Sequence, residues 1–362
     1  MKFSKRQHFR NGMALIMVMI AIAVFSTMAG LLWFEMKVET HLAMRADDEQ
    51  QLLWLGRSGV EYARWILSQE ASIAGEPYDS LNQIWAGGPG GPGETNSVLA
   101  GISMDNYPLG GGTISIKIID LERYANINTA NSLMLQQALT VMGVDADSLS
   151  VVSDSIQDWI DTDDAPRTAG AESDYYQSLT PPYSAKNAPI DDLSELLLVK
   201  GVTPEMYWGD TSSNILASQQ PQKPKLGFGN SPDQTPEYPF GLKDIFTPIS
   251  SGQININTAD TNVLQMIPGV DAATAATIVQ QRAGPDGVDG TDDDTPFRSV
   301  RQLATAGVSA AVVQQIGNFC TVRSSTFEVH VTAKIGDSTR EFVATLFRNS
   351  GADIQVVGFY WK

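Results

Sequence analysis

The longest pattern in the chain is an apolar run near its N-terminus. Met13 to Phe34 is uncharged and almost wholly apolar, and it follows a short segment with four basic residues, Lys2, Lys5, Arg6 and Arg10. About 20 such residues span a bilayer as one helix, because lipid offers backbone amides no partner outside the helix. The pattern predicts a single-pass membrane anchor, with the basic flank in the cytoplasm and the rest of the chain on the other side.

Apolar residues continue beyond this run at helical spacing. From Glu35 to about Ser68 they recur every three or four positions with charged residues between them, which is typical of an amphipathic helix. Together the two segments predict one helix of about 50 residues, about 75 Å long at 1.5 Å per residue. Two helices with a bend near Gly56 or Gly59 are the alternative. An amphipathic helix must bury its stripe, so we expect part of it to pack on the protein's own β-domain and part to face partner helices, through Val38, Leu42, Leu52 and Leu55.

The remaining chain divides into strands at both ends and short helices between them. Residues 113–119 alternate polar and apolar positions, and so do 327–333, 340–347 and 354–360, which read as an antiparallel meander. Between them, 121–320 has the pattern of short helices joined by Gly and Asp turns. One strand before and three after predict a helical domain inserted into a β-sheet domain. Two stretches predict exposed loops: 86–94, which is rich in Gly and Pro, and 219–241, which is rich in Pro, Gln, Gly and Lys.

Two short motifs repeat inside the predicted insert. Asn126–Asn131 and Asn255–Asp260 are nearly the same hexapeptide, each placed to open a helix. We expect its Thr, or the Asn before that Thr, to accept a hydrogen bond from the amides of the first helical turn. A second element joins Gly-Val to Asp, Thr or Ser, and it occurs at 143–145, 201–203, 269–271 and 307–309. We expect its Gly to adopt the left-handed conformation that closes one helix, its Val to enter the core and its third residue to cap the next helix.

One segment of the insert, Met266–Arg282, resembles a helix-hairpin-helix motif. In DNA-binding members of that family the hairpin amides hold phosphates, with Lys or Arg nearby. Here Arg282 is the basic residue close by, whereas Asp271 sits at the hairpin and an acidic loop follows. The motif therefore predicts the fold of this segment and favours a structural or protein-binding use over DNA binding.

Charge and composition narrow the function further. The net charge is −17, and a strongly acidic surface repels phosphate backbones, so we expect no nucleic acid partner. The single cysteine, Cys320, excludes an internal disulfide. His8, His41 and His330 lie in the leader, the long helix and a strand, and no phosphate loop or nucleophile motif is present. The sequence therefore predicts that the protein is not an enzyme.

Two acidic clusters are the candidate metal sites. Calcium takes six to eight oxygen ligands from a flexible loop, and clustered carboxylates repel one another unless they are solvated or bound to a cation. Each cluster is therefore a candidate Ca²⁺ site, with a solvated acidic loop as the alternative. The candidate ligands are Asp158, Asp161, Asp163, Asp164, Glu172 and Asp174 in the first cluster, and Asp286, Asp289, Asp292, Asp293 and Asp294 in the second.

The N-terminus resembles the leader of a type IV prepilin or pseudopilin. It has the order basic segment, Gly12, Met13 and uninterrupted apolar helix. The resemblance implies that a prepilin peptidase cleaves after Gly12 and that Met13 becomes the mature, methylated N-terminus. Removing the four basic side chains of the leader would change the net charge from −17 to −21. Many members have Glu at the fifth mature position, whereas this chain has Met17, which points to a minor pseudopilin.

Further stretches resemble the K-type minor pseudopilin of type II secretion. These are Asp158–Asp164, Ala171–Tyr176 and Ser194–Val202. The resemblance implies a type IV pilin-like α+β fold: a long N-terminal transmembrane helix and a small antiparallel sheet, carrying a large inserted all-α domain with helix-hairpin-helix or SAM-like units. The expected divisions are a leader over 1–12, the transmembrane and spine helix over 13–70, the first part of the β-domain over 71–120, the helical insert over 121–320 and the closing strands over 321–362.

The same resemblance implies a structural role at the inner membrane. A K subunit joins I- and J-type minor pseudopilins, caps the tip of a periplasmic pseudopilus and supports protein export across the outer membrane. Other pseudopilins, the prepilin peptidase and the inner-membrane assembly platform are its further expected partners. Related K subunits also bind calcium in the insert. The alternative is a membrane-anchored helix-hairpin-helix receptor, or a minor pilin of a type IV pilus, that binds DNA for uptake.

Overall fold

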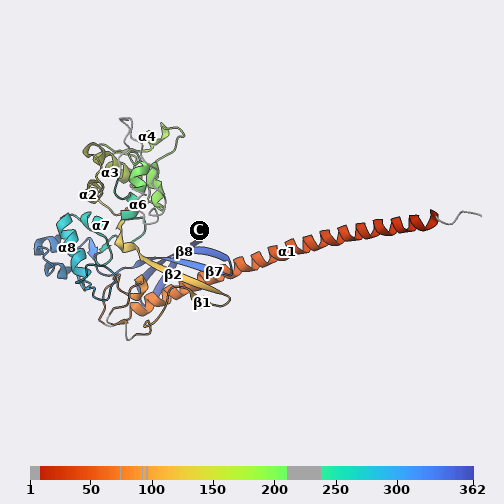
Figure 1. The fold of residues 1–362 in the computed structure, drawn as a ribbon. Helices are drawn as coiled ribbons and strands as arrows, with labels where there is room; N and C mark the ends of the chain where they lie inside the picture. The colour runs from red at the N-terminus through yellow and green to blue at the C-terminus, as the bar shows by residue number, and fades with distance from the viewer. Residues whose placement is uncertain (1–8, 74, 92, 95–96, 210–237) are drawn as a thin grey trace, which may run out of the picture.

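A single long helix, α1 (Phe9–Glu70), dominates the computed structural model, which describes residues 9–73, 75–91, 93–94, 97–209 and 238–362 (Figure 1). Its N-terminal half projects away from the rest of the molecule, and the side chains described over 13–47 are exposed. Its C-terminal half lies against a sheet. The prediction of one continuous helix is confirmed, and the alternative of two helices with a bend near Gly56 or Gly59 is wrong. The predicted leader, 1–12, falls mostly outside the described residues.

The sheet has five antiparallel strands in the order β1-β2-β7-β8-β9. Their bounds are Tyr107–Leu109 (β1), Gly112–Asp120 (β2), Thr326–Ile335 (β7), Ser338–Ser350 (β8) and Asp353–Trp361 (β9). Strand β2 pairs directly with β7, with Ile116 opposite Val331, although some 200 residues separate them in the chain. The predicted insertion into a β-domain is therefore confirmed. Strand β1 is an addition to the four predicted strands.

Two glycines let α1 approach the sheet closely. A Cβ on Gly56 would lie 2.4 Å from the Phe342 ring, and one on Gly59 would lie 2.4 Å from Val331. Around this contact, Leu52, Leu55 and further residues of α1 are buried among strand side chains. The prediction that Leu52 and Leu55 face partner helices is therefore wrong: they lie in the protein's own core because the sheet covers this part of the stripe.

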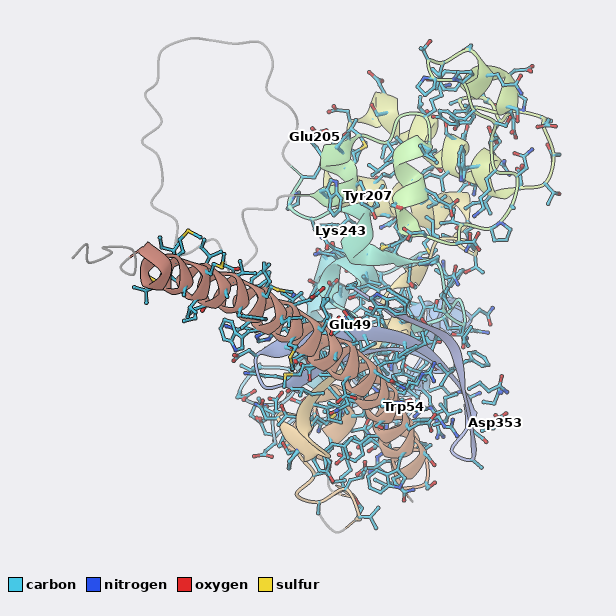
Figure 2. All side chains as sticks on the ribbon, turned by 90° about the vertical axis from the view of Figure 1, so that its right-hand side faces the viewer. Glu49, Trp54, Glu205, Tyr207, Lys243 and Asp353 are labelled. Carbon is cyan, nitrogen blue, oxygen red and sulfur yellow. The ribbon has the colours of Figure 1, made fainter. Side chains whose placement is uncertain are left out.

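Side chains along the junction of α1 and the sheet follow the same division. Glu49 is exposed and forms an ion pair with Arg340 of β8 at 3.5 Å. Trp54 is exposed, and the guanidinium of Arg57 lies over its ring. Figure 2 shows Glu49 and Trp54 on α1 where it reaches the folded body, with Asp353 at the start of β9 beyond them. The helix therefore passes from a fully exposed rod to a packed element within about one turn of Leu52.

The insert consists of short helices in two parts, each beginning with one of the repeated hexapeptides. In the first part, β3 (Ala125–Asn126) pairs in parallel with β4 (Phe246–Thr247). Its helices are α2 (Ser132–Met142), α3 (Ala146–Ile160), α4 (Ser173–Gln177), α5 (Pro204–Trp208) and α6 (Leu242–Ile245). Short 3₁₀ turns cover Ile84–Ala86, Leu121–Arg123, Leu193–Leu198 and Val300–Ala304. The predicted loop over 219–241 lies almost entirely outside the described residues.

The second part repeats this arrangement. Strand β5 (Ile254–Asn255) pairs in parallel with β6 (Cys320–Thr321), and the helices are α7 (Thr261–Gln265), α8 (Ala272–Arg282) and α9 (Ala310–Ile316). The last residue of each hexapeptide caps a helix: Asn131 accepts from the amide of Met134, and Asp260 accepts from those of Asn262 and Val263. The prediction that the Thr or the Asn before it is the capping residue is therefore wrong, because each helix begins after the hexapeptide ends. Both parts share one hydrophobic core.

The predicted Gly-Val elements form as expected at all four glycines. Gly143, Gly201, Gly269 and Gly307 have φ between 84° and 93°, the left-handed region that glycine occupies without strain. The third residue caps the next helix at Thr203, Asp271 and Ser309. Asp145 precedes α3 without a capping side-chain hydrogen bond, so the capping prediction is wrong there.

A buried polar contact joins the second part of the insert to the sheet domain. The Asn255 Nδ2 donates to the Asp79 carbonyl at 3.1 Å, to Asp120 Oδ2 at 3.2 Å and to Ser324 Oγ at 2.8 Å. All four residues are at most 3% exposed, and buried polar groups of this kind are costly to leave unpaired. The first hexapeptide residue of this repeat therefore also positions the insert on the sheet.

Candidate functional site

Three regions bear on function: the exposed half of α1, the acidic clusters and the helix-hairpin-helix segment. Helix α1 is the one helix in the described residues that is long and apolar enough to cross a membrane. Val38 and Leu42 lie on its exposed half and are 42% and 61% exposed. Of the four residues predicted to meet partner helices, these two are therefore uncovered. Gly12 and Met13, the predicted processing site, lie within the helix as described.

The first acidic cluster forms where α3 ends and α4 begins. One carboxylate oxygen from each of Asp161, Asp163 and Glu172 lies within 4.8 Å of the others. Asp161 immediately follows α3 as its C-cap, and Glu172 immediately precedes α4, so the turn between the two helices brings the three acids together. These three are the predicted ligands that the structure places close enough to share one cation.

Several oxygens in this cluster have no hydrogen-bond partner among the described residues. Both carboxylate oxygens of Glu172 and Oδ1 of Asp161 are buried and unpaired, and so is Oδ1 of the nearby Asn187. Asn187 also donates to Asp164 Oδ1 at 2.9 Å. Burial, followed by the charges of Asp158 and Asp161, raises the pKa of Glu172 to about 7. Unpaired oxygens beside like charges are what a bound cation would satisfy.

The other predicted ligands of this cluster have different surroundings. Asp158 is fully buried and pairs with Arg167 Nη1 at 2.7 Å, and the same guanidinium also pairs with Asp161. The cluster therefore contains a basic residue, which relieves part of the repulsion between Asp158 and Asp161. Asp174 is exposed.

The second acidic loop turns its carboxylates toward its own backbone. Asp286 accepts from the amide of Val288 at 2.8 Å, Asp293 from that of Asp286 at 3.0 Å and Asp294 from that of Gly290 at 2.8 Å. Asp289 forms a two-point ion pair with Arg282, and Asp292 is exposed. Among the described residues, no three of these acids converge as the first cluster does.

The basic residue of the hairpin is not available to a phosphate. Arg282 is 3% exposed, and besides Asp289 it donates to the carbonyls of Ile256 at 2.7 Å and Ala259 at 2.6 Å. Its guanidinium therefore joins the acidic loop to the second hexapeptide. Cys320 is buried as well, and burial raises the pKa of its thiol to about 12, so it is a poor nucleophile.

Sequence reasoning missed a third acidic group. Glu70, Glu76 and Glu94 also bring carboxylate oxygens within 4.8 Å of one another, and all three are buried. They are spread over 25 residues and appear as no cluster in the sequence. The sequence feature that could have indicated this group is the glycine-rich stretch just before Glu94, which was predicted only as an exposed loop.

Comparisons with known proteins agree with this architecture. Residues 116–208 match the family described as type II secretion system (T2SS), protein K, and residues 250–321 match the helix-hairpin-helix motif. The type II secretion system protein K of Pseudomonas aeruginosa is 25% identical over 96% of this chain and 92% of its own length. The corresponding protein of Pectobacterium carotovorum is 25% identical over 55% of this chain and 60% of its own length.

A solved structure gives the same fold. The match is to a chain in the crystal structure of the GspK-GspI-GspJ complex from the type 2 secretion system of enterotoxigenic Escherichia coli. It has a TM-score of 0.60 and 20% sequence identity, and it covers 88% of this chain and 99% of that one.

The fold and the anchor define a pilin-like membrane protein whose sheet domain carries a helical insert. The matches above make the chain similar to type II secretion system protein K over almost its whole length. It is a pseudopilin anchored in the inner membrane by α1.

Proposed function

We propose that this pseudopilin caps the tip of a periplasmic pseudopilus and supports protein export across the outer membrane, in a structural and not a catalytic role. The observation that carries the proposal is the position of the insert. It lies at the end of the sheet domain opposite the projecting half of α1 (Figure 1). In a filament whose α1 helices bundle along the axis, a further subunit stacked above would collide with this mass.

The orientation and processing follow from the N-terminus. The basic leader stays in the cytoplasm, α1 crosses the inner membrane and the sheet domain with its insert lies in the periplasm. A prepilin peptidase cleaves after Gly12, and Met13 becomes the mature N-terminus. The support is the order of basic residues, Gly12 and apolar helix.

The partners are I- and J-type minor pseudopilins, as in the complex named for the structural relative. The exposed stripe of α1 is the surface that fits them, because Val38 and Leu42 are exposed while the same stripe is covered from Leu52 onward. Other pseudopilins and the inner-membrane assembly platform complete the environment of α1.

Calcium bound by Asp161, Asp163 and Glu172 is part of this proposal. Its support is the convergence of three carboxylates together with unpaired buried oxygens on Asp161, Glu172 and Asn187. Oxygen-only ligands match Ca²⁺. The ion would hold the turn between α3 and α4 in place, and no chemical step passes through it.

The partner assignment is tested by affinity purification of the tagged full chain from detergent extracts of its host. The expected result is recovery of two smaller pilin-like subunits. Leu42→Glu should lose most of that recovery, because it places a charge on the exposed stripe. Thr40→Glu places the same charge on the opposite face of α1 and serves as the matched control. Retention of both subunits by Leu42→Glu, or recovery of DNA without either subunit, would contradict the proposal.

A further inference from the structure

The third acidic group lies in the sheet domain, far from the clusters of the insert. Glu70 is the last residue of α1, and Glu76 and Glu94 come from the segment that connects α1 to β1. Their exposed fractions are 2%, 7% and 0%. In the described part of the chain none of them pairs with a basic side chain, and the buried Arg348 is paired with Asp79 instead.

The glycine-rich stretch wraps around these carboxylates. The amide of Gly93 donates to Glu76 at 2.6 Å, and the amide of Ile84 donates to Glu94 at 3.1 Å. A Cβ on Gly91 or Gly93 would lie 2.9 Å or 2.8 Å from a carboxylate oxygen of Glu76. The glycines are therefore required because backbone and carboxylate approach closely, which a loop free in solvent would not need.

A buried glutamine is held in one orientation beside the group. The Gln83 Oε1 accepts from the Ser80 amide at 2.9 Å and from Trp85 Nε1 at 3.0 Å. Its Nε2 therefore faces the acids and donates to Glu70 Oε1. This hydrogen bond satisfies Oε1 of Glu70 but not Oε2.

The other oxygen of Glu70 also points to a bound cation. Among the described residues the buried Glu70 Oε2 has no hydrogen-bond partner, while the carboxylates of Glu76 and Glu94 lie within 4.8 Å. An unpaired buried carboxylate oxygen beside two others costs several kcal/mol unless a cation or a proton neutralises it. A proton would neutralise one of three carboxylates, whereas a divalent cation would neutralise two and fill the open position.

We propose that Glu70, Glu76 and Glu94 bind one Ca²⁺ ion, which fastens the glycine-rich loop to the C-terminal end of α1. All ligand atoms are carboxylate oxygens, the donors that calcium prefers, and neither histidine nor cysteine, which zinc prefers, is among them. The site is independent of the cluster in the insert and of the proposed tip function. Its occupation would stiffen the base of the sheet domain, where the spine helix ends.

The test uses the full chain in detergent micelles, freed of metal with EGTA and then titrated with Ca²⁺. Glu172→Gln removes the proposed site of the insert, so calcium that this variant still binds reports on the glutamate site. We expect Glu172→Gln to retain one tightly bound Ca²⁺ per chain and a calcium-dependent rise in Tm of about 5 °C at 100-fold excess over Kd. Adding Glu76→Gln should weaken that binding at least ten-fold.

Two controls keep the result interpretable. Near-ultraviolet circular dichroism shows whether each variant keeps its packed aromatic residues, and Glu70→Gln provides a second ligand substitution if Glu76→Gln does not fold. The proposal would be overturned if Glu172→Gln bound no calcium, or if adding Glu76→Gln left the calcium affinity unchanged. A rise in Tm from Glu70→Gln that is equal with and without calcium would show that a proton alone occupies the group, and would also overturn the proposal.

Discussion

Two parts of the amphipathic stripe on α1 have the same sequence pattern and opposite environments. Val38 and Leu42 are exposed, while Leu52 and Leu55, farther along the same stripe, are 3% and 7% exposed against the sheet. The periodicity of a helix shows that a stripe must be covered, but it does not show by what. In this protein the sheet covers one half, and the other half requires lipid and partner subunits. The predictions below test this division, beginning with the largest expected effect.

Leu55→Ala should destabilise the sheet domain strongly. Removing a buried Leu side chain costs about 2 to 5 kcal/mol, and Leu55 is part of the core beneath the sheet. Leu42→Ala is the matched control and should leave the unfolding free energy of the isolated chain unchanged, because that side chain is 61% exposed. Denaturant unfolding in detergent measures both. Equal losses would mean that the halves of α1 do not differ as described.

Gly59→Ala should also destabilise the chain, by about 1 to 3 kcal/mol, because the new methyl group would overlap Val331. Gly30→Ala adds the same methyl group where no atom lies within 4 Å. In a helix that change should be neutral or slightly stabilising. The difference in Tm between the two variants is the measurement, and a stabilised Gly59→Ala variant would contradict the close packing of α1 on the sheet.

Glu172→Gln should weaken calcium binding by the insert at least ten-fold, or about 1.4 kcal/mol. The carboxylate it removes lies beside Asp161 and Asp163. Asp292→Asn is the control in the second acidic loop, where the side chain is exposed, and it should leave the affinity unchanged. Calorimetric titration with Ca²⁺ measures the affinity of both variants. A larger loss of affinity in Asp292→Asn than in Glu172→Gln would place the calcium site in the second loop.

The smallest expected effect is a pH dependence from β7. His330 lies between Glu328 at 2.7 Å and Glu341 at 2.8 Å, and its bond to Glu328, followed by that to Glu341, raises the pKa of the imidazole against the opposing effect of burial. A raised pKa means that this contact stabilises the fold fully below about pH 6.5 and less as the pH rises through the folded value.

The contribution should be below about 1 kcal/mol, because the group is partly exposed. The measurement is the stability difference between wild type and His330→Asn across pH 5 to 9. It should be largest at the acidic end and shrink toward the alkaline end. A difference that is constant over this range would exclude the charged pair.

Local signals predicted much of the fold. Four positive-φ glycines and the four longer strands were all visible, because each depends on neighbouring residues in the chain. The helix starts after the two hexapeptides were visible too, but the capping side chains are Asn131 and Asp260 and not the predicted Thr or the Asn before it. Strand β1 was missed because three residues at 107–109 carry too little alternation to detect. Asp145 failed as a cap although its motif matches the others, so the tripeptide alone does not determine the hydrogen bond.

The candidate sites were less predictable because they depend on distant residues. The composition of 158–174 indicated a metal site, but only the fold separates the converging Asp161, Asp163 and Glu172 from the Arg167-paired Asp158. The exposed and covered parts of α1 could not be separated either, since Val331 and Phe342 lie almost 300 residues away in the chain. Glu70, Glu76 and Glu94 show no pattern at all until the loop folds around them.

The position of the insert in an assembled pseudopilus tests the account most directly. Filaments containing the full chain can be labelled with gold-conjugated antibody against a tag in the insert and viewed by electron microscopy. The account predicts label at one end of each filament, because the insert blocks stacking above it. Label distributed along the shaft would contradict it.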